Sequence, residues 1–246
     1  MTHIAVIGLG QIGGSIVLAL RRKSIPYKIT GIDTSRKRLR LLQKRLDATA
    51  TSWKAAEGAD LVVLCLQYQP ILEYLRQAKA DQLVIDVCSG KEKIVRLAKR
   101  RNLRFIGGHP LAGNEHAGEK GWRQDLFEQT PFFISPAGRS RPVDVAIVRK
   151  FITALGAYPV KVDPAKHDRY LAMTSHFPTF LSAILRETSR SVPSLFRGPG
   201  YRSMIRLSRT PPESLETFIH SNRSNILKAA ILLRRNLDRW LETTKR

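Results

Sequence analysis

A glycine motif near the start of the chain limits its fold more than any other feature of the sequence. Residues 8–13 read GLGQIG, directly after the apolar run 4–7 and before an apolar helical pattern over 16–20. A strand, a G-x-G-x-x-G turn and a helix in this order form a dinucleotide-binding unit, because glycines permit a tight turn and close approach of the backbone to a pyrophosphate. A glycine-rich turn without a ligand is the alternative. The residues predicted to bind the dinucleotide are Gly8, Gly10, Gln11, Ile12 and Gly13.

An acidic residue follows the next apolar run. Residues 29–32 predict a second strand, and Asp33 comes directly after it, about 20 residues beyond the last glycine of the motif. A carboxylate at this position accepts hydrogen bonds from ribose hydroxyls and repels a 2′-phosphate, which favours NAD over NADP as the cofactor. The basic residues 36–38 could offset part of that repulsion.

Strand and helix patterns continue to alternate after this unit. The apolar runs lack polar alternation, which is typical of parallel strands covered on both faces. The sequence therefore predicts an α/β, Rossmann-type, doubly wound parallel sheet that ends near Asp163, with domains at residues 1–163 and 164–246. The further strands and helices are expected at residues 60–66, 71–78, 83–87, 94–99, 132–134, 144–155 and 158–162.

The last third of the chain carries helical patterns only. Apolar residues recur at helical spacing over 171–185, where Pro178 is predicted to kink the helix, and again over 226–240. Roughly 80 residues of helix make a thin core alone. We therefore expect this all-α domain to pack on a second copy of the chain and form a homodimer.

The net charge of +22, from 42 basic and 20 acidic residues, allows two interpretations. Clustered Lys and Arg residues bind nucleic-acid phosphates, whereas a basic surface also attracts an anionic cofactor or substrate. Here the basic residues are spread along the chain, without a basic tail or a basic patch interleaved with aromatic residues. That distribution favours a solvated basic surface over a nucleic-acid site.

The sequence also bears on the compartment. No apolar run approaches the ~20 residues that span a bilayer, and the first residues enter a strand pattern without a secretory signal. Cys65 and Cys88 lack the spacing of metal ligands and lie at the ends of apolar runs. We predict a cytoplasmic protein with no membrane segment and no metal, in which both cysteines are buried thiols.

A glycine-rich segment with two histidines, residues 107–118, is the predicted reaction centre. It follows the apolar run 103–106 and carries His109, Glu115 and His116. In α/β folds, polar groups on loops at the carboxyl ends of strands perform the chemistry, and glycines permit the sharp turns of such loops. We therefore predict a loop here that presents polar side chains to a substrate.

Together these features resemble the prephenate/arogenate dehydrogenase family of tyrosine biosynthesis. The resemblance covers almost the whole chain and implies NAD(P)-dependent oxidative decarboxylation of a cyclohexadienyl acid, with an α-helical dimerisation domain. Among its substrates we favour prephenate, which gives 4-hydroxyphenylpyruvate, over arogenate or 4-amino-4-deoxyprephenate. The alternative from another class is a nucleotide-sensing regulator that binds nucleic acid, which the net charge motivates. The matching motifs lie at residues 8–15, 86–91, 108–115, 167–168, 175–178, 201–206 and 222–223.

The resemblance also assigns roles to single residues. It implies that His109 is the base or hydrogen-bond acceptor for the ring hydroxyl and that Ser89 holds this hydroxyl beside the nicotinamide. Capping of a turn by His109 and of a helix by Ser89 are the alternatives. Arg206 corresponds to the residue that binds a carboxylate of the dicarboxylate substrate, since a guanidinium binds a carboxylate bidentately; a surface position is its alternative. Arg202 is a second candidate, and His167 is a candidate pocket residue.

The chain departs from the family pattern on the substrate side. Thr179 stands where the family has the second histidine of Ser-His-Leu-Pro-His, and we keep it as a substrate-binding candidate. Residues 203–205 replace the family's Asp-x-Thr, and Leu215 stands where many members carry tryptophan. His116 is predicted to be a loop histidine without a catalytic role, and His176 to pack or hydrogen-bond inside the helical domain.

Overall fold

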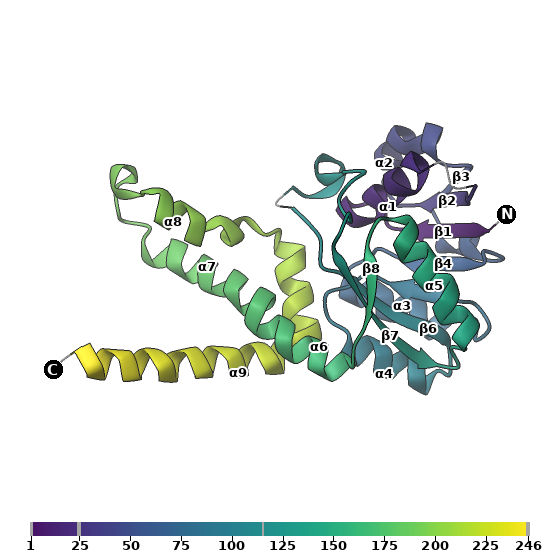
Figure 1. Ribbon diagram of the computed structural model, residues 1–246. Helices are drawn as coiled ribbons and strands as arrows, with labels where there is room; N and C mark the ends of the chain where they lie inside the picture. Colours follow the sequence, from purple (N-terminus) through teal and green to yellow (C-terminus); the bar gives the residue numbers. More distant parts are fainter. Residues whose placement is uncertain (1, 24–25, 115, 245–246) are drawn as a thin grey trace. The chain divides into compact units, whose positions relative to one another are not determined.

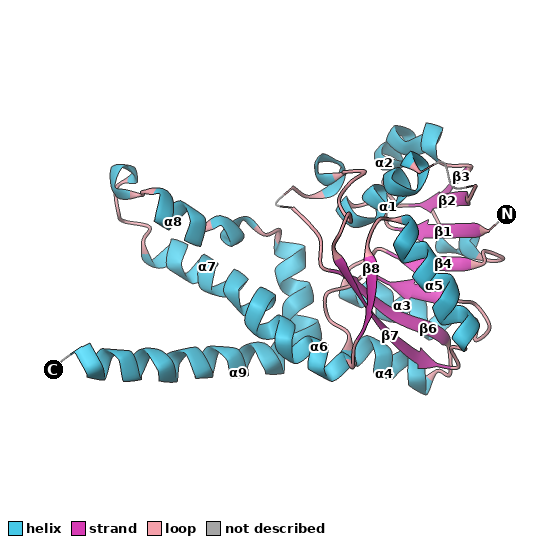
Figure 2. Ribbon diagram, viewed as in Figure 1, coloured by secondary structure: helices cyan, strands magenta, loops and turns pink. Residues whose placement is uncertain are grey.

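The computed structural model describes residues 2–23, 26–114 and 116–244. It divides the chain into two units, Met1–Pro164 and Ala165–Arg246. The first unit contains every strand among the described residues, and the second is helical (Figure 2). Glu115 of the predicted reaction centre lies outside the described residues.

The first unit is built on a mostly parallel sheet with the strand order β3-β2-β1-β4-β5-β6-β7-β8 (Figure 1). The strand order reverses between β1 and β4, as it does in the doubly wound folds that bind dinucleotides. The Rossmann-type fold predicted from the sequence is therefore confirmed. The strands are β1 His3–Ile7, β2 Lys28–Ile32, β3 Ala48–Ala50, β4 Leu61–Leu64, β5 Val84–Asp86, β6 Arg104–Pro110, β7 Pro131–Gly138 and β8 Tyr158–Lys161.

Both faces of this sheet are covered, which explains why its strands are continuous apolar runs. In β1, Ile4 and Val6 belong to one apolar cluster, which α1 and α5 complete, and Ala5 and Ile7 belong to another, which α3 and α4 complete. Because successive side chains of a strand point to opposite faces, burial of both faces requires apolar residues throughout. The helices of this unit are α1 Gln11–Arg22, α2 Arg36–Leu42, η1 Gln43–Arg45, η2 Trp53–Ala56, α3 Tyr68–Gln77, α4 Glu92–Arg100, η3 Gly118–Gly121 and α5 Pro142–Ala154.

Two features of the sheet correct the sequence predictions. The expected loop does not begin at Gly107, because β6 continues to Pro110 with Gly107 and Gly108 inside the strand. A Cβ at Gly108 would lie 2.4 Å from the backbone oxygen of Asp86, so these glycines permit close packing rather than a turn. The sheet is also not wholly parallel, because β7 runs antiparallel to β6. A parallel return needs a crossover, and the described part of residues 111–130 contains no α-helix.

The second unit is a set of helices around a small apolar core. Its core consists of Ala172, Phe177, Ile226 and Ala229, with Phe180, Phe218 and Ala230 packed against them. Pro178, predicted to kink a helix, lies in the first turn of α7, directly after a π-helical turn that interrupts the α-helical pattern. A kink that was not predicted lies in α9, at Asn222. The elements are α6 Pro164–Leu171, the π-helical turn η4 Ala172–His176, α7 Phe177–Thr188, η5 Ser194–Phe196, α8 Pro199–Met204, η6 Arg206–Arg209 and α9 Pro212–Thr244.

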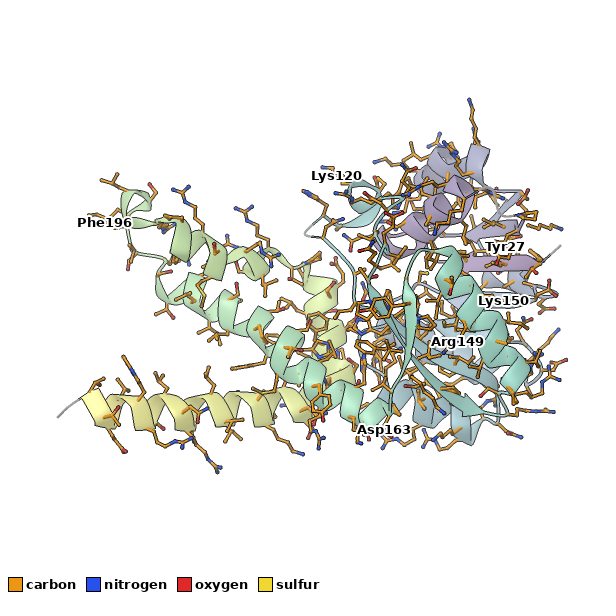
Figure 3. The ribbon with its side chains drawn as sticks, viewed as in Figure 1. Tyr27, Lys120, Arg149, Lys150, Asp163 and Phe196 are labelled. Atoms are coloured by element: carbon orange, nitrogen blue, oxygen red, sulfur yellow. The ribbon has the colours of Figure 1, made fainter. Side chains whose placement is uncertain are left out.

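Many large apolar side chains of the second unit face outward. Phe196, labelled in Figure 3, is 74% exposed. The later part of α9 adds a series of exposed apolar residues, which are Leu227, Ile231, Leu232, Leu233, Leu237, Trp240 and Leu241. A helix normally buries one apolar face against a partner. In the described part of the chain, no helix combines the length and the apolar character needed to cross a membrane.

Candidate active site

The glycine motif forms the turn between β1 and α1. Gly8 adopts a φ of 90°, and a Cβ at Gly13 would lie 1.9 Å from the backbone oxygen of Gly8, so the shape of this turn requires both glycines. A Cβ at Gly10, by contrast, would meet nothing within 4 Å. Gly10 is also the N-cap of α1 and provides no side-chain cap. Open space in front of uncapped helix amides suits a pyrophosphate, so this turn fits a dinucleotide.

Asp33 is hydrogen-bonded to this turn. Its carboxylate, at the end of β2, accepts hydrogen bonds from the backbone N–H of Leu9 (2.6 Å) and of Ser35 (2.7 Å). The Arg38 guanidinium lies 3.5 Å from the same carboxylate. Asp33 is therefore fixed against the glycine turn, at the place where the sequence predicted the ribose carboxylate.

His109 lies near the end of β6, at the same carboxyl edge of the sheet. It is 9% exposed, and its ring centre is 6.4 Å from that of Phe133 on the neighbouring strand β7. Since β1, β2, β4, β5 and β6 are parallel, their carboxyl ends meet at one edge. The structure thus brings His109 to the edge that carries the glycine turn and Asp33.

A buried ion pair contacts the backbone directly before His109. The Lys91 ammonium donates to the Asp86 carboxylate, and Lys91 is only 1% exposed. Asp86 also accepts from the backbone N–H of Gly108 (3.1 Å), next to His109, and of Cys88 (3.0 Å). Burial raises the pKa of the Asp86 carboxyl, and Lys91 opposes that shift. The pair therefore joins the end of β6 to the bend after β5. Both residues belong to the motif at 86–91, but their pairing was not predicted.

Ser89 lies half-buried in that bend and stands between Asp86 and Lys91 in the sequence. The alternative role predicted for it, capping of the next helix, is wrong, because α4 begins at Glu92 with Lys91 at the N-cap. β5 and β6 are neighbours in the sheet. Ser89, just after β5, and His109, near the end of β6, therefore lie at the same edge of the sheet.

Residues 111–114 and 116–123, here called the docked segment, fold onto the glycine turn after β6. The Gln11 side chain donates to the backbone oxygens of Asn114 (2.9 Å) and His116 (2.6 Å) and to the Asn114 side chain. The Trp122 indole N–H donates to the backbone oxygen of Gly10 (2.9 Å). The Gln11 side chain is thus engaged within the protein, so only its backbone remains a candidate for the cofactor. His116 is exposed.

Charged residues join the docked segment to the region beyond β2. The Lys37 ammonium lies 2.6 Å from one oxygen of Glu119, and Arg38 lies 3.4 Å from the other. The hydrogen bond from Lys37 is the main reason why the pKa of Glu119 falls to about 2. Because Arg38 also faces Asp33, one chain of charges connects Glu119 with the predicted ribose carboxylate.

In the second unit, His167 lies in a buried polar cluster. Its Nδ1 is 2.9 Å from the Asp168 carboxylate, and the Asn222 side chain donates to the backbone oxygen of Asp168 (2.6 Å) and to His176 Nδ1 (3.0 Å). Burial lowers the pKa of His176 to about 4, so its ring is neutral at neutral pH. The ring also stacks on Phe218, which confirms the predicted packing role of His176.

The other substrate-side candidates of the second unit differ in exposure. Arg206 in η6 is exposed, and so is Arg202 in α8, whose guanidinium donates to the backbone oxygen of Arg197 (3.0 Å). Thr179 is buried, and its hydroxyl donates to the backbone oxygen of Ser175 (3.0 Å) within the helix. η6 packs against α7, which carries Thr179.

One hollow of the first unit is lined by other residues. A hollow of about 490 Å³ is lined by Tyr27, Arg149 and Lys150, labelled in Figure 3, together with Lys23, Thr153 and Ala154. It includes none of the predicted site residues. Both cysteines are free thiols, and the described residues contain no group of His, Cys, Asp and Glu side chains that could hold a metal ion.

Comparison with known families gives two matches that together span most of the chain. The model described as "Prephenate dehydrogenase, nucleotide-binding domain" matches residues 16–161. The model described as "Prephenate dehydrogenase, dimerization domain" matches residues 163–245.

Individual relatives point the same way. Prephenate dehydrogenase of Bacillus subtilis (strain 168) is 27% identical over 255 residues, covering 97% of this chain and 67% of that protein. The fold is similar to that of A. aeolicus prephenate dehydrogenase in complex with hydroxyphenyl propionate and NAD+, with a TM-score of 0.91, 24% identity, and coverage of 100% and 91% of the two chains. Synechocystis arogenate dehydrogenase gives a TM-score of 0.81 at 25% identity, covering 99% and 92%.

Proposed function

The chain belongs to the prephenate dehydrogenase family, and from this premise we propose that it converts prephenate to 4-hydroxyphenylpyruvate by NAD-dependent oxidative decarboxylation. The observation that carries the proposal is the meeting of the glycine turn, Asp33 and His109 at one edge of the sheet in a chain matched by both family domains. We assign dinucleotide binding to residues 1–163. Substrate binding and dimerisation are assigned to residues 164–246.

In this proposal the first unit holds the cofactor. The open space at Gly10 takes the pyrophosphate, where the backbone N–H groups of Gln11 and Ile12 donate to it. Gly8 and Gly13 shape the turn, and the Asp33 carboxylate accepts from the adenosine ribose hydroxyls. When bound, the nicotinamide accepts the hydride of the oxidation.

His109 is the proposed base. The imidazole takes the proton of the ring hydroxyl as the carbon that bears this hydroxyl loses its hydride. Ser89 holds the hydroxyl in place. Loss of carbon dioxide then makes the ring aromatic, which drives the overall reaction forward.

The second unit supplies the proposed contacts to the carboxylates of the substrate. Arg206 is the first candidate because its guanidinium is exposed and can bind a carboxylate bidentately. Arg202 is the second. His167 and Thr179 are proposed pocket residues, although both are buried and hydrogen-bonded within their own unit.

Replacement of Arg206 by alanine tests the carboxylate contact. We expect KM for prephenate to rise about 10- to 100-fold with a smaller change in kcat, the range for losing a charge-assisted hydrogen bond. Initial rates of NADH formation give both constants. Arg209→Ala, an exposed arginine in the same short helix η6, is the matched control and should leave KM unchanged. An unchanged KM in Arg206→Ala would remove Arg206 from the site.

The association and the location of the chain are also proposals. The match to a dimerization-domain model and the exposed apolar residues of α9 support a homodimer formed through the second unit. Two free cysteines agree with a reducing compartment such as the cytoplasm.

The decisive experiment compares substrates side by side. Purified protein is incubated with NAD+ and with prephenate, arogenate or 4-amino-4-deoxyprephenate, and NADH absorbance is followed. We expect the highest kcat/KM with prephenate; the amino analogue is included because Thr179 and Leu215 depart from the family pattern. Salt-sensitive binding of nucleic acid without NADH formation from any of the three would overturn the proposal in favour of a regulator.

A further inference from the structure

Two of the three basic residues 36–38, Lys37 and Arg38, stand beside the proposed ribose site, and one acidic residue pairs with both. We propose that Glu119 is a selectivity residue for the cofactor: by pairing with Lys37 and Arg38 it keeps these cations from binding a 2′-phosphate, and so disfavours NADP. This inference rests on the proposed function, since it concerns the dinucleotide that the enzyme would use.

Glu119 contacts both cations, one with each carboxylate oxygen. One carboxylate oxygen is 2.6 Å from Lys37 Nζ, and the other is 3.4 Å from Arg38 Nε. Arg38 also faces Asp33, and its Nη1 lies 3.5 Å from the Asp33 carboxylate. Glu119 thus joins Lys37, Arg38 and Asp33 in a cluster of two carboxylates and two cations beside the end of β2.

Glu119 is held at this place by the rest of the docked segment. It lies in η3, next to Lys120, which is labelled in Figure 3. Trp122 and Gln11 attach the segment to the glycine turn by hydrogen bonds on both sides of η3. The Glu119 side chain is 25% exposed. Its position is therefore fixed by contacts with the dinucleotide turn itself.

The chemistry of the two cofactors explains why this cluster selects between them. NADP differs from NAD by a 2′-phosphate on the adenosine ribose, and enzymes that bind it use basic side chains near the end of β2. Lys37 and Arg38 are such side chains, and both bind phosphate well in general. While Glu119 pairs with them, a 2′-phosphate would have to displace one carboxylate and approach another, Asp33. The low pKa of Glu119 keeps it ionised throughout the neutral range.

The test is Glu119→Gln, which keeps the shape of the side chain and removes its charge. Dissociation constants for NAD+ and NADP+ are measured by calorimetric titration, independently of turnover. We expect NADP+ to bind about tenfold more tightly or better than to the unmodified protein, and NAD+ to bind within about twofold of it, because only the phosphate gains from the freed cations. The gain should shrink at high salt, since exposed charges are screened.

Two further variants separate selectivity from general effects. Glu57→Gln removes the same charge from an exposed pair with Lys79 (2.9 Å) and should leave both dissociation constants unchanged. Adding Lys37→Met to Glu119→Gln should reverse much of the gain in NADP+ affinity, because Lys37, at 68% exposure, is available to the phosphate once Glu119 is neutral.

The outcomes distinguish this inference from the proposed function. If Glu119→Gln weakens both dinucleotides equally, or leaves their ratio unchanged while NAD+ still binds, Glu119 only supports the fold and the inference is wrong. If the unmodified protein binds neither dinucleotide, the proposed function itself fails. A change in ratio that Glu57→Gln reproduces would assign the effect to net charge and would also overturn the inference.

Discussion

Replacement of His109 by asparagine is expected to lower kcat by about 10²- to 10⁴-fold, the range for losing a general base. Asparagine fills much of the same space near the end of β6 but cannot take a proton from the ring hydroxyl. The glycine turn and Asp33 follow other strands, β1 and β2. The affinity for NAD+ should therefore stay nearly the same. Steady-state NADH formation gives kcat, and calorimetric titration gives the dissociation constant of NAD+.

The matched control for this variant is His116→Asn. His116 lies in the docked segment, is exposed, and forms its hydrogen bonds with Gln11 and Asn114 through its backbone atoms. The substitution retains these atoms, so kcat should not change. Equal turnover in the His109 and His116 variants would remove His109 from the mechanism. A parallel loss of NAD+ affinity in His109→Asn would point to a structural role instead.

The overall fold could be predicted because two physical patterns are local in the sequence. Burial of both faces of the sheet makes β1 and β4 continuous apolar runs. The glycine turn is equally local, since Gly8 needs a positive φ and Gly13 touches Gly8 five residues away. The direction of β7 could not be predicted in this way, because it depends on how residues 111–130 connect the strands.

The contacts inside the candidate site were harder to predict from the sequence than the fold. Gly107 and Gly108 look like turn residues in the sequence, but they are strand residues that pack against Val95 and the Asp86 backbone. The hydrogen bond between Trp122 and Gly10 joins residues 112 positions apart. Such contacts follow from tertiary packing, for which the sequence offers only an indirect signal. One such signal is Gly14, which directly follows the motif, because a Cβ there would overlap the Trp122 ring.

The same limit applies to the second unit. Its helical character follows from apolar spacing, and its thin core could be anticipated from its length. The kink at Asn222 could not be read from the sequence, since Pro178 is the stronger local signal. Asn222 bonds to the Asp168 backbone and to His176 from a distant part of the chain. The polar cluster around His167 is therefore a tertiary property.

Replacement of Lys91 by methionine is expected to destabilise the first unit by about 3–5 kcal/mol, the range for removing one partner of a buried ion pair. Methionine fills similar space, but the Asp86 carboxylate keeps its burial and loses its cation. Urea unfolding followed by tryptophan fluorescence gives the free energy. A Trp240→Phe background leaves Trp53 and Trp122 of the first unit as reporters. Lys79→Met, which breaks an exposed pair with Glu57, should leave the midpoint nearly unchanged.

The pH dependence of this loss has a definite sign. Burial raises the pKa of Asp86 in the folded state above its value in the unfolded chain, about 3.9. Lys91 opposes this shift, so its removal raises the folded pKa further. The folded variant then binds a proton that the unfolded chain has released, and its stability falls as pH rises through this interval. The difference from the unmodified protein should be small near about pH 4 and grow towards neutrality. Adding Asp86→Asn should recover part of the free energy, because a neutral amide needs no cation; no recovery would place the loss in packing around Lys91 instead.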